Sequence, residues 1–256
     1  MLIDTHAHLN FNAYKEDSFE VLRRSLDNGV WMINVGSQYS TSKRAVEMAE
    51  KYENGVYAAI GLHPIHLETE VFDYEKYKEL AKSKKVVAIG EIGLDYKPEY
   101  ASSEEKQKTV LSQQLKLAEA LSLPVIFHCR MSHDDLIKIL SENGSRTGGV
   151  IHCFTGAWKQ AEKYLGMGLY LGFNGIIFKL NLDEIIEKTP LDRVLLETDC
   201  PYLTPKPMEG RNEPSYVKYV AEKIAKVKGL GYEEVVEITT KNAQKLFRIP
   251  ASPAGR

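Results

Sequence analysis

Short apolar runs alternate with segments of helical hydrophobic period from one end of the chain to the other. A short continuous apolar run is typical of a strand buried on both faces, whereas apolar residues at i, i+3 and i+4 indicate an amphipathic helix. Strands are accordingly predicted over residues 2–9, 30–35, 56–62, 86–92, 125–129, 150–154, 169–173 and 194–198. Helices are predicted over residues 18–28, 42–52, 72–81, 104–121, 134–142, 158–165, 182–188, 216–226 and 233–246.

Eight strands that alternate with helices predict an α/β fold with a parallel sheet, and eight is the number that closes a (β/α)8 TIM barrel. An open, doubly wound sheet is the alternative, but it usually carries a glycine-rich phosphate loop after the first strand. Asn10, Phe11 and Asn12 stand at that place instead. The length of 256 residues suits one barrel. A single domain is therefore predicted over residues 1–250, followed by a short C-terminal tail over 251–256.

Composition narrows the choice of partners and compartment. The hydrophobic fraction of 43% is enough for a full core, and the net charge of -2 excludes a protein that binds nucleic acid through bulk positive charge. Three cysteines, an odd number, imply no disulfide framework. The chain shows neither a signal peptide nor an apolar run of about 20 residues that could span a membrane. A cytoplasmic monomer without a membrane partner is expected.

Candidate chemistry gathers where the predicted strands end. Five of the seven histidines stand there, and acidic residues end the fourth and eighth strands. These residues are His6, His8, His63, Glu91, His128, His152 and Asp199. His6 and His8 are two residues apart, so strand alternation sends both imidazoles to one face. Because the active site of a TIM barrel lies at the C-terminal ends of its strands, we expect these side chains to meet at the barrel mouth.

Imidazole and carboxylate ligands without thiolate suit Mg²⁺, Mn²⁺, Zn²⁺ or similar ions. Four histidines and two carboxylates are too many for one tetrahedral ion and predict two divalent ions. The first and eighth strands, neighbours in a closed barrel, supply one ligand set: His6, His8 and Asp199. The adjacent fifth and sixth strands supply the other set: His128 and His152. Glu91 lies between the sets, where its two oxygens could bridge both ions. Any one of these residues alone would be read as a hydrogen-bonded strand end.

The three cysteines each follow a predicted ligand directly along the chain. If that ligand points into the barrel mouth, strand alternation turns Cys129 and Cys153 outward, toward the helices. Cys200 already stands at a loop, and its direction is left open. All three are predicted to be small buried apolar residues, and neither metal ligands nor nucleophiles.

Six motifs follow one another along the chain: IDTHAH at 3–8, GLHP at 61–64, GEIGLD at 90–95, FHCR at 127–130, IHCFTG at 151–156 and LETDCPY at 196–202. This series resembles the TatD family of metal-dependent deoxyribonucleases, and the resemblance covers nearly the whole chain. It implies a TIM-barrel hydrolase of the amidohydrolase superfamily, with a two-metal site that cuts phosphodiester bonds in DNA. It also implies the metal assignment given above. The residues alone indicate only a barrel with a dinuclear site.

The hypothesis for catalysis is a water activated by two divalent ions, which also neutralise charge on the phosphate oxygens. Asp199 would bind one ion and take the proton from the attacking water, and Glu91 would bridge. Glu197, two residues before Asp199 on the same face, would orient a ligand or a water. His63 completes neither ligand set, so it would bind a phosphate oxygen or protonate the leaving group. A capping role for His63 beside Pro64 is an equal alternative.

Basic and aromatic residues near the predicted mouth are candidates for substrate binding. Arg130 follows the fifth strand and could clamp a phosphate, as could Arg211 in the long loop after the eighth strand. Aromatic residues in the same region could stack on unpaired bases: Tyr96, Tyr100, Trp158 and Tyr202. DNA as single strands or strand ends is the expected substrate, because a concave mouth accepts a strand end more easily than a duplex.

Two other classes of protein compete with a nuclease. A dinuclear amidohydrolase, phosphotriesterase or lactonase would act on a small molecule, and several such relatives bridge their metals with a carboxylated lysine. Residues 86–95 contain no lysine and offer Glu91 instead, which favours the TatD-like interpretation. A metal-binding module without turnover is the third class. The six intact ligands together with Glu197 argue for an enzyme.

Overall fold

A ring of parallel strands forms the centre of the molecule in the computed structural model, which describes residues 1–143 and 147–251. Eight strands follow one another in chain order, and each pairs in parallel with the next. They are β1 (Leu2–Ala7), β2 (Val30–Val35), β3 (Val56–Ile60), β4 (Val86–Asp95), β5 (Val125–Arg130), β6 (Gly149–Ile151), β7 (Tyr170–Phe173) and β8 (Val194–Leu196). The predicted (β/α)8 barrel is confirmed. Residues 252–256 of the predicted tail lie outside the described residues.

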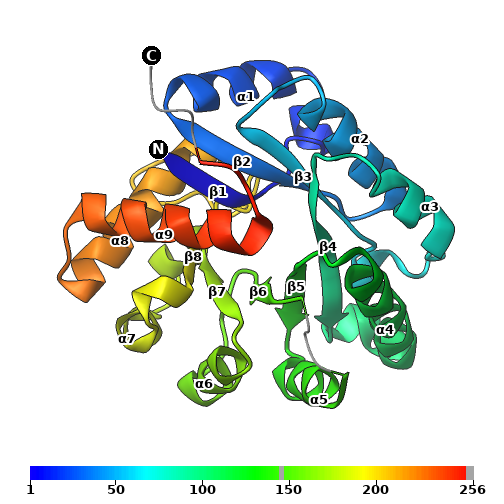
Figure 1. Cartoon of the computed structure of the whole chain (residues 1–256). Coiled ribbons are helices and arrows are strands. Elements are labelled where there is room, and N and C mark those ends of the chain that lie inside the picture. Colours follow the sequence, from blue (N-terminus) through cyan, green and yellow to red (C-terminus); the bar gives the residue numbers. More distant parts are fainter. Residues whose placement is uncertain (144–146, 252–256) are drawn as a thin grey trace.

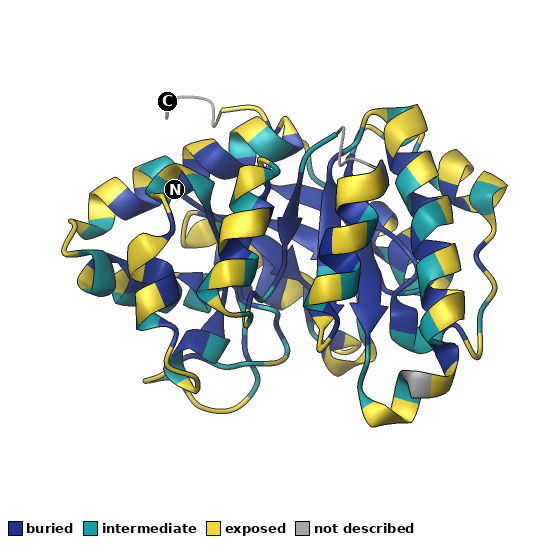
Figure 2. Ribbon diagram, turned by 90° about the horizontal axis from the view of Figure 1, so that it is seen from below, coloured by how far each residue is buried: buried dark blue, intermediate teal, exposed yellow. Residues whose placement is uncertain are grey.

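Helices surround this ring (Figure 1). They are α1 (Ser18–Asp27), α2 (Tyr39–Ala49), α3 (Tyr74–Leu80), α4 (Glu104–Leu121), α5 (His133–Asn143), α6 (Trp158–Gly166), α7 (Asp183–Lys188), α8 (Val217–Lys228) and α9 (Tyr232–Phe247). Figure 2 shows buried strands inside and helices whose outer faces are exposed, as amphipathic helices on a barrel require. Within the described residues, no helix combines the length and apolar character needed to cross a bilayer.

Strand alternation divides the core into an outer and an inner layer. The inner layer fills the barrel with side chains such as Ile126 of β5, Val150 of β6 and Leu195 of β8. Successive side chains of a strand point to opposite faces, so the residue two places further on returns to the same side. Two places beyond these core residues stand His128, His152 and Glu197. The apolar filling of the barrel therefore continues directly into the polar residues at its mouth.

The ring closes between β8 and β1 through backbone hydrogen bonds. Asp199 N donates to His6 O at 2.8 Å, and His8 N donates to Cys200 O at 3.0 Å. Below this seam, the buried carboxylate of Asp4 accepts hydrogen bonds from the backbone N–H groups of His6 and Thr198. Residues from the two ends of the chain are thereby fixed next to one another.

The loop after β8 is tied to the segment after β1. Asn212 is fully buried, and its Nδ2 donates to Thr198 O at 2.9 Å and to Tyr202 O at 2.6 Å. The hydroxyl of Tyr14 donates to Asn212 O. An ion pair between Arg24 and Glu213 adds a contact nearer the surface. These contacts hold one side of the barrel mouth in place.

Strand ends differ from prediction where the backbone leaves extended geometry. β6 ends at Ile151 and β8 at Leu196, earlier than predicted, whereas β4 continues to Asp95. Cys153 and Asp199 adopt φ of 47° and 57°, a left-handed conformation that residues other than glycine rarely take. The chain therefore turns sharply at the mouth just after these two strands.

Replacement of Asn212 by alanine is expected to lower the free energy of unfolding by about 2 kcal/mol, because the buried carbonyl of Thr198 and the partly buried carbonyl of Tyr202 lose their donor. Urea unfolding monitored by circular dichroism measures the change. Asn54→Ala, at an exposed position, serves as the matched control and should change stability little. Equal stability of the two variants would show that the loop after β8 does not depend on Asn212.

Candidate metal centre

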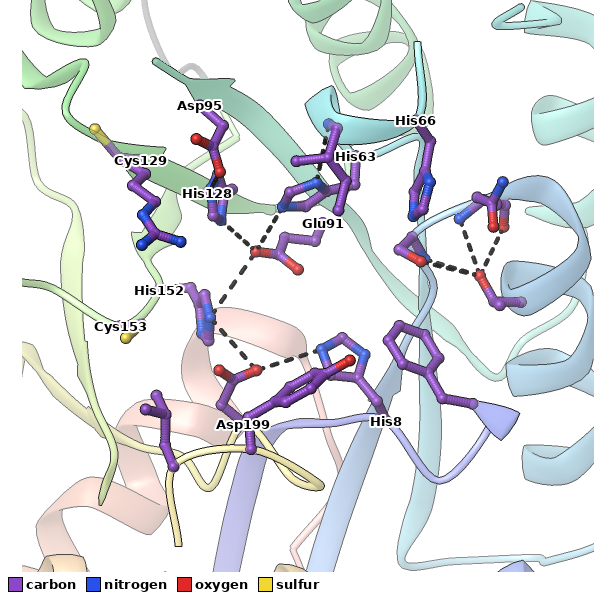
Figure 3. A pocket seen from close by; sticks show the side chains of 18 of the residues that line it. His8, His63, His66, Glu91, Asp95, His128, Cys129, His152, Cys153 and Asp199 are labelled. Atoms are coloured by element: carbon purple, nitrogen blue, oxygen red, sulfur yellow. Dashed lines mark hydrogen bonds and ion pairs between the residues drawn. The ribbon is translucent and has the colours of Figure 1, made fainter. Parts of the chain in front are cut away.

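A pocket of about 950 Å³ opens at the C-terminal ends of the strands. Five of the six predicted metal ligands line it: His8, Glu91, His128, His152 and Asp199. The sixth, His6, is fully buried beside His8, with the two Nε2 atoms 3.1 Å apart. Figure 3 shows Glu91 and Asp199 in the centre of this arrangement, with imidazoles around them. The structure thus brings all six residues together from five strands or strand ends.

Glu91 lies between the two predicted ligand sets. One of its oxygens, Oε2, is 3.5 Å from His6 Nε2, and the other, Oε1, is 2.8 Å from His128 Nδ1. Asp199 Oδ1 is 3.4 Å from His8 Nε2 and 3.8 Å from His152 Nε2. Each carboxylate is therefore within reach of imidazoles from opposite sides of the barrel.

Hydrogen bonds at the far ring nitrogens fix which nitrogen of each imidazole faces the centre. His8 Nδ1 lies 2.8 Å from Val35 O, and a carbonyl only accepts, so the proton is on Nδ1. Carboxylates play the same part for two other rings. His152 Nδ1 is 2.9 Å from Glu197 Oε2, and His128 Nε2 is 3.0 Å from Asp95 Oδ2. The neutral forms of His8 and His152 consequently direct a lone pair toward the centre, and neutral His128 does so when its proton is on Nε2, toward Asp95.

Lone pairs that face carboxylate oxygens need a positive charge between them. His8 Nε2 meets Asp199 Oδ1 at 3.4 Å, an acceptor facing an acceptor, and His128 Nδ1 meets Glu91 Oε1 in the same way when its proton is on Nε2. A proton on an imidazole supplies part of this positive charge. Burial lowers the pKa of His152, but the charges of Glu197, Asp199 and Glu91 raise it to about 10. Because the facing atoms are nitrogen and oxygen without thiolate, the residues present fit divalent metal ions.

The central carboxylates remain ionised in spite of their burial. Burial raises the pKa of Glu91, but the neighbouring His63 and His6 hold it well below its usual value. The pKa of Asp199 is likewise raised by burial and lowered more strongly by the neighbouring imidazoles of His8, His152 and His6. Two negative charges are thus available to hold cations.

His63 presents an N–H group to the same centre. Its Nδ1 accepts a hydrogen bond from Ile65 N at 3.2 Å, so the proton is on Nε2, which faces Glu91 Oε1 at 3.4 Å. Burial and the nearby His128 lower the pKa of His63 to about 4, which keeps the ring neutral. His63 therefore caps the turn at Pro64 and also points a donor into the pocket. A ring nitrogen of His63 lies close enough to the potential ligand atoms of Glu91 and His128 to share a metal with them. A nitrogen that carries a proton has no lone pair for a metal, however.

Asp95 is a site residue that was not predicted. The predicted fourth strand ends at residue 92, before Asp95. Glu91, Gly93 and Asp95 follow the period of two, and this pattern could have placed the second carboxylate on the same face as the first. In the structure β4 reaches Asp95, whose carboxylate orients His128.

The cysteines divide between two environments. Cys129 Sγ contacts Ser132 Oγ at 3.4 Å and Tyr164 OH at 3.7 Å, toward helices α5 and α6 as predicted. Both residues border the pocket (Figure 3), but the prediction for Cys153 is wrong, because its Sγ lies 3.6 Å from Asn174 Oδ1 at the end of β7 and not against a barrel helix. β6 ends at Ile151 and the backbone turns at Cys153, so strand alternation no longer applies there.

Of the two predicted phosphate-binding arginines, the structure brings one to the pocket. Arg130 lines it, and its side chain forms no hydrogen bond or ion pair with any described residue. Arg211 is not among the lining residues, and it pairs with Asp17 and lies 4.2 Å over the ring of Tyr14. The charge of Arg211 therefore helps to hold the loop after β8 against the segment after β1.

The predicted aromatic residues divide in the same way. Tyr100 and Tyr202 line the pocket. Tyr96 instead donates to Asp135 at 2.8 Å, and the ring of Trp158 lies under Lys188.

The sequence profile of the family described as TatD related DNase matches residues 3–248. The chain belongs to the TatD family. It is 46% identical to the uncharacterized metal-dependent hydrolase YabD of Bacillus subtilis (strain 168), and the match covers 97% of this chain and 100% of that one. It is 34% identical to the 3'-5' ssDNA/RNA exonuclease TatD of Erwinia billingiae (strain Eb661), over 98% and 100% of the two chains.

A solved structure of the family agrees with this one. The crystal structure of YJJV, a TatD homolog from Escherichia coli K12, superposes with a TM-score of 0.89 at 34% identity, over 97% of this chain and 98% of that one. The family indicated by the six motifs is confirmed, and the protein is a TatD-family metal-dependent hydrolase.

Asp95→Asn is expected to weaken divalent metal binding about 10- to 100-fold, because an anion that orients a ligating imidazole raises its basicity. Competition with a chromophoric chelator measures the affinity for Zn²⁺ or Mn²⁺. Asp192→Asn, at an exposed position before β8, is the matched control. If Asp95→Asn binds the metal as tightly as the wild type does, His128 is not a metal ligand.

Addition of a divalent ion to chelator-treated protein is expected to raise its stability by about 2.7 kcal/mol when the free ion reaches 100 times its dissociation constant. Differential scanning calorimetry measures the rise. Glu91→Gln should lose most of the effect, because the carboxylate between the two predicted ligand sets loses its negative charge. A wild-type transition indifferent to Mg²⁺, Mn²⁺ and Zn²⁺ would contradict a metal centre here.

Proposed function

We propose that this protein is a nuclease that hydrolyses phosphodiester bonds in DNA, at single strands or strand ends, with two divalent ions at the barrel mouth. The observation that carries the proposal is the position of Glu91, with one oxygen toward His6 and the other toward His128. A carboxylate so placed supports a pair of ions. The relative named 3'-5' ssDNA/RNA exonuclease supports nucleic acid as the substrate class.

The residues divide into two ligand sets. His6, His8 and Asp199 would hold one ion, and His128 and His152 the other, with Glu91 shared between them. Bound divalent ions supply Lewis-acid chemistry, in which a water nucleophile is acidified and charge on the phosphoryl oxygens is neutralised. All other tasks belong to side chains of the chain itself.

Asp199 is placed to accept the proton from the attacking water. Its side chain retains some exposure at the pocket, and its lowered pKa keeps it ionised at neutral pH. Glu197 acts through His152: its Oε2 accepts from His152 Nδ1 at 2.9 Å and from Cys153 N at 3.1 Å. Gly172 makes room for this carboxylate, because a Cβ there would lie 1.9 Å from Glu197 Oε1.

His63 and Arg130 are the groups proposed to bind phosphate. The N–H of His63 Nε2 can donate a hydrogen bond to a phosphate oxygen or to the leaving oxygen, and the neutral ring keeps its proton in doing so. Arg130 has its guanidinium free for a phosphate, which its planar fork suits.

The decisive experiment uses chelator-treated protein with Mg²⁺, Mn²⁺ or Zn²⁺ added back singly. Labelled single-stranded DNA, duplex DNA and RNA are assayed beside a small phosphodiester, a phosphotriester and a panel of lactones. We expect metal-restored cleavage of single-stranded DNA and a fall of at least about 100-fold in Asp199→Asn. The Asp192→Asn control should cleave as the wild type does. Turnover of a lactone or triester with nucleic acids left intact would move the substrate to the other amidohydrolase classes.

His63→Asn tests the donor role. Asparagine can still accept from Ile65 N but lacks the N–H that faces Glu91, so kcat should fall about 100- to 1000-fold. Metal affinity, measured by chelator competition, should remain that of the wild type. A loss of affinity comparable to that in Asp95→Asn would instead make His63 a metal ligand.

A further inference from the structure

The two sides of the pocket differ in charge. Two lining residues are positively charged: Lys97 follows β4, and Arg130 is the last residue of β5. The loops after β1, β2 and β3 contribute neutral groups, and we call this part of the lining the alcove: Phe11, Asn12, Gln38, Ser40 and His66. Figure 3 shows His66 on the opposite side of Glu91 from Cys129, the neighbour of Arg130. A phosphate would find a cation on one side and none in the alcove.

Several polar groups of the alcove are free to bind a ligand. The side chains of Asn12, Ser40 and His66 form no hydrogen bond with any residue that the structure describes. The neighbouring hydroxyl of Thr41 is occupied, since its Oγ1 accepts from the backbone N–H groups of Ser37 and Gln38, just before α2. An amide and an imidazole each offer a donor and an acceptor, as the edge of a nucleobase does.

An aromatic ring of the alcove lies directly beside the metal centre. The rings of Phe11 and His8 are stacked, with centroids 4.2 Å apart and planes 18° apart. Phe11 is half-buried and lines the pocket, so part of its ring remains open to a planar ligand. Because His8 Nε2 faces Asp199 at 3.4 Å, this ring is separated from the reacting centre by a single imidazole.

We propose that the alcove binds the base of the terminal nucleotide, and that the rest of the strand leaves the pocket across Arg130 and Lys97. The inference rests on the proposed nuclease function. A terminal nucleoside carries a base and a sugar but no further phosphate, which suits a neutral wall with an aromatic ring. The remaining strand carries a phosphate at every step, which suits the cationic side. The geometry makes the terminal base, and not a base within the strand, the recognised group.

Abasic substrates test the base subsite. Single-stranded decamers are prepared with an abasic residue at either terminus or next to it, and kcat/KM is compared with that for the intact decamer. An abasic residue at the terminus that is attacked should lower kcat/KM about 10- to 100-fold in the wild type, as the loss of one stacked base predicts. An abasic residue one step inward should matter less. The reverse order of these effects would overturn the proposal.

Phe11→Leu completes the comparison. It should lower kcat/KM for the intact decamer about as much as the terminal abasic residue does, and lower it no further on that abasic substrate. Phe19→Leu, at an exposed position on α1, is the matched control. Equal losses on both substrates would show that Phe11 only positions His8. Asn12→Ala, with Asn54→Ala as its control, should show the same dependence on the terminal base.

Arg130→Gln tests the path of the strand. The variant should raise KM about tenfold for a decamer and leave a dinucleotide, which has no phosphate beyond the scissile one, almost unaffected. Arg193→Gln, at the opposite end of the barrel, is the control. Equal effects on both lengths would place Arg130 at the scissile phosphate and overturn the proposed path.

Binding provides a second readout. Calorimetric titration of the metal-loaded protein with a deoxynucleoside monophosphate and with deoxyribose phosphate should show about tenfold tighter binding of the former, and Phe11→Leu should remove the difference. Wild-type protein that cleaves oligonucleotides without regard to the terminal base would overturn the subsite alone. Wild-type protein that cleaves no oligonucleotide with any metal would overturn the nuclease function, and the subsite with it.

Discussion

The site depends on one constraint: imidazole lone pairs lie close to buried carboxylate oxygens, and both kinds of atom are acceptors. Glu91 and Asp199 are negative and almost enclosed, and neutral His8 and His152 turn ring acceptors toward them. Such an arrangement is costly without cations, because unpaired charges lose their hydration on burial. Val35 O, Asp95 and Glu197 hold the rings in that orientation from behind. The polar layer behind the rings therefore determines which atoms are available for chemistry.

The barrel supplies the rigidity that this arrangement requires. Ligands stand on strands whose other residues fill the inner core, so Ile126 and Val150 fix His128 and His152 through the same backbone. The alcove residues, in contrast, lie outside the strands, and their backbone does not position residues of the inner core. Asn12 and Ser40 lie on exposed loop or helix-start positions, where substitutions leave the strands unchanged. Chemistry and recognition thus belong to different parts of the chain.

Much of this could be predicted from the sequence, for a physical reason. Strands buried on both faces give short apolar runs, and parallel strands in a closed barrel bring the histidines that end these runs to one mouth. Prediction failed where the backbone leaves regular geometry: a left-handed turn at Cys153 is not visible in the order of apolar and polar residues. It failed again at Arg211, since nothing near it in the sequence shows that Asp17, 194 positions away, pairs with its charge.

The seam between β8 and β1 has a consequence for biosynthesis. Asp4 and Thr198 are separated by 194 positions, and the backbone of His6 bonds to that of Asp199. A growing polypeptide must therefore carry His6 and His8 through most of translation before their partner leaves the ribosome. Contacts between residues so far apart in the sequence form slowly. Until β8 is made, β1 therefore leaves an edge of the sheet unpaired. Any nascent or truncated product that stops before β8 lacks Asp199, so the first proposed ligand set can be completed only when translation is nearly finished.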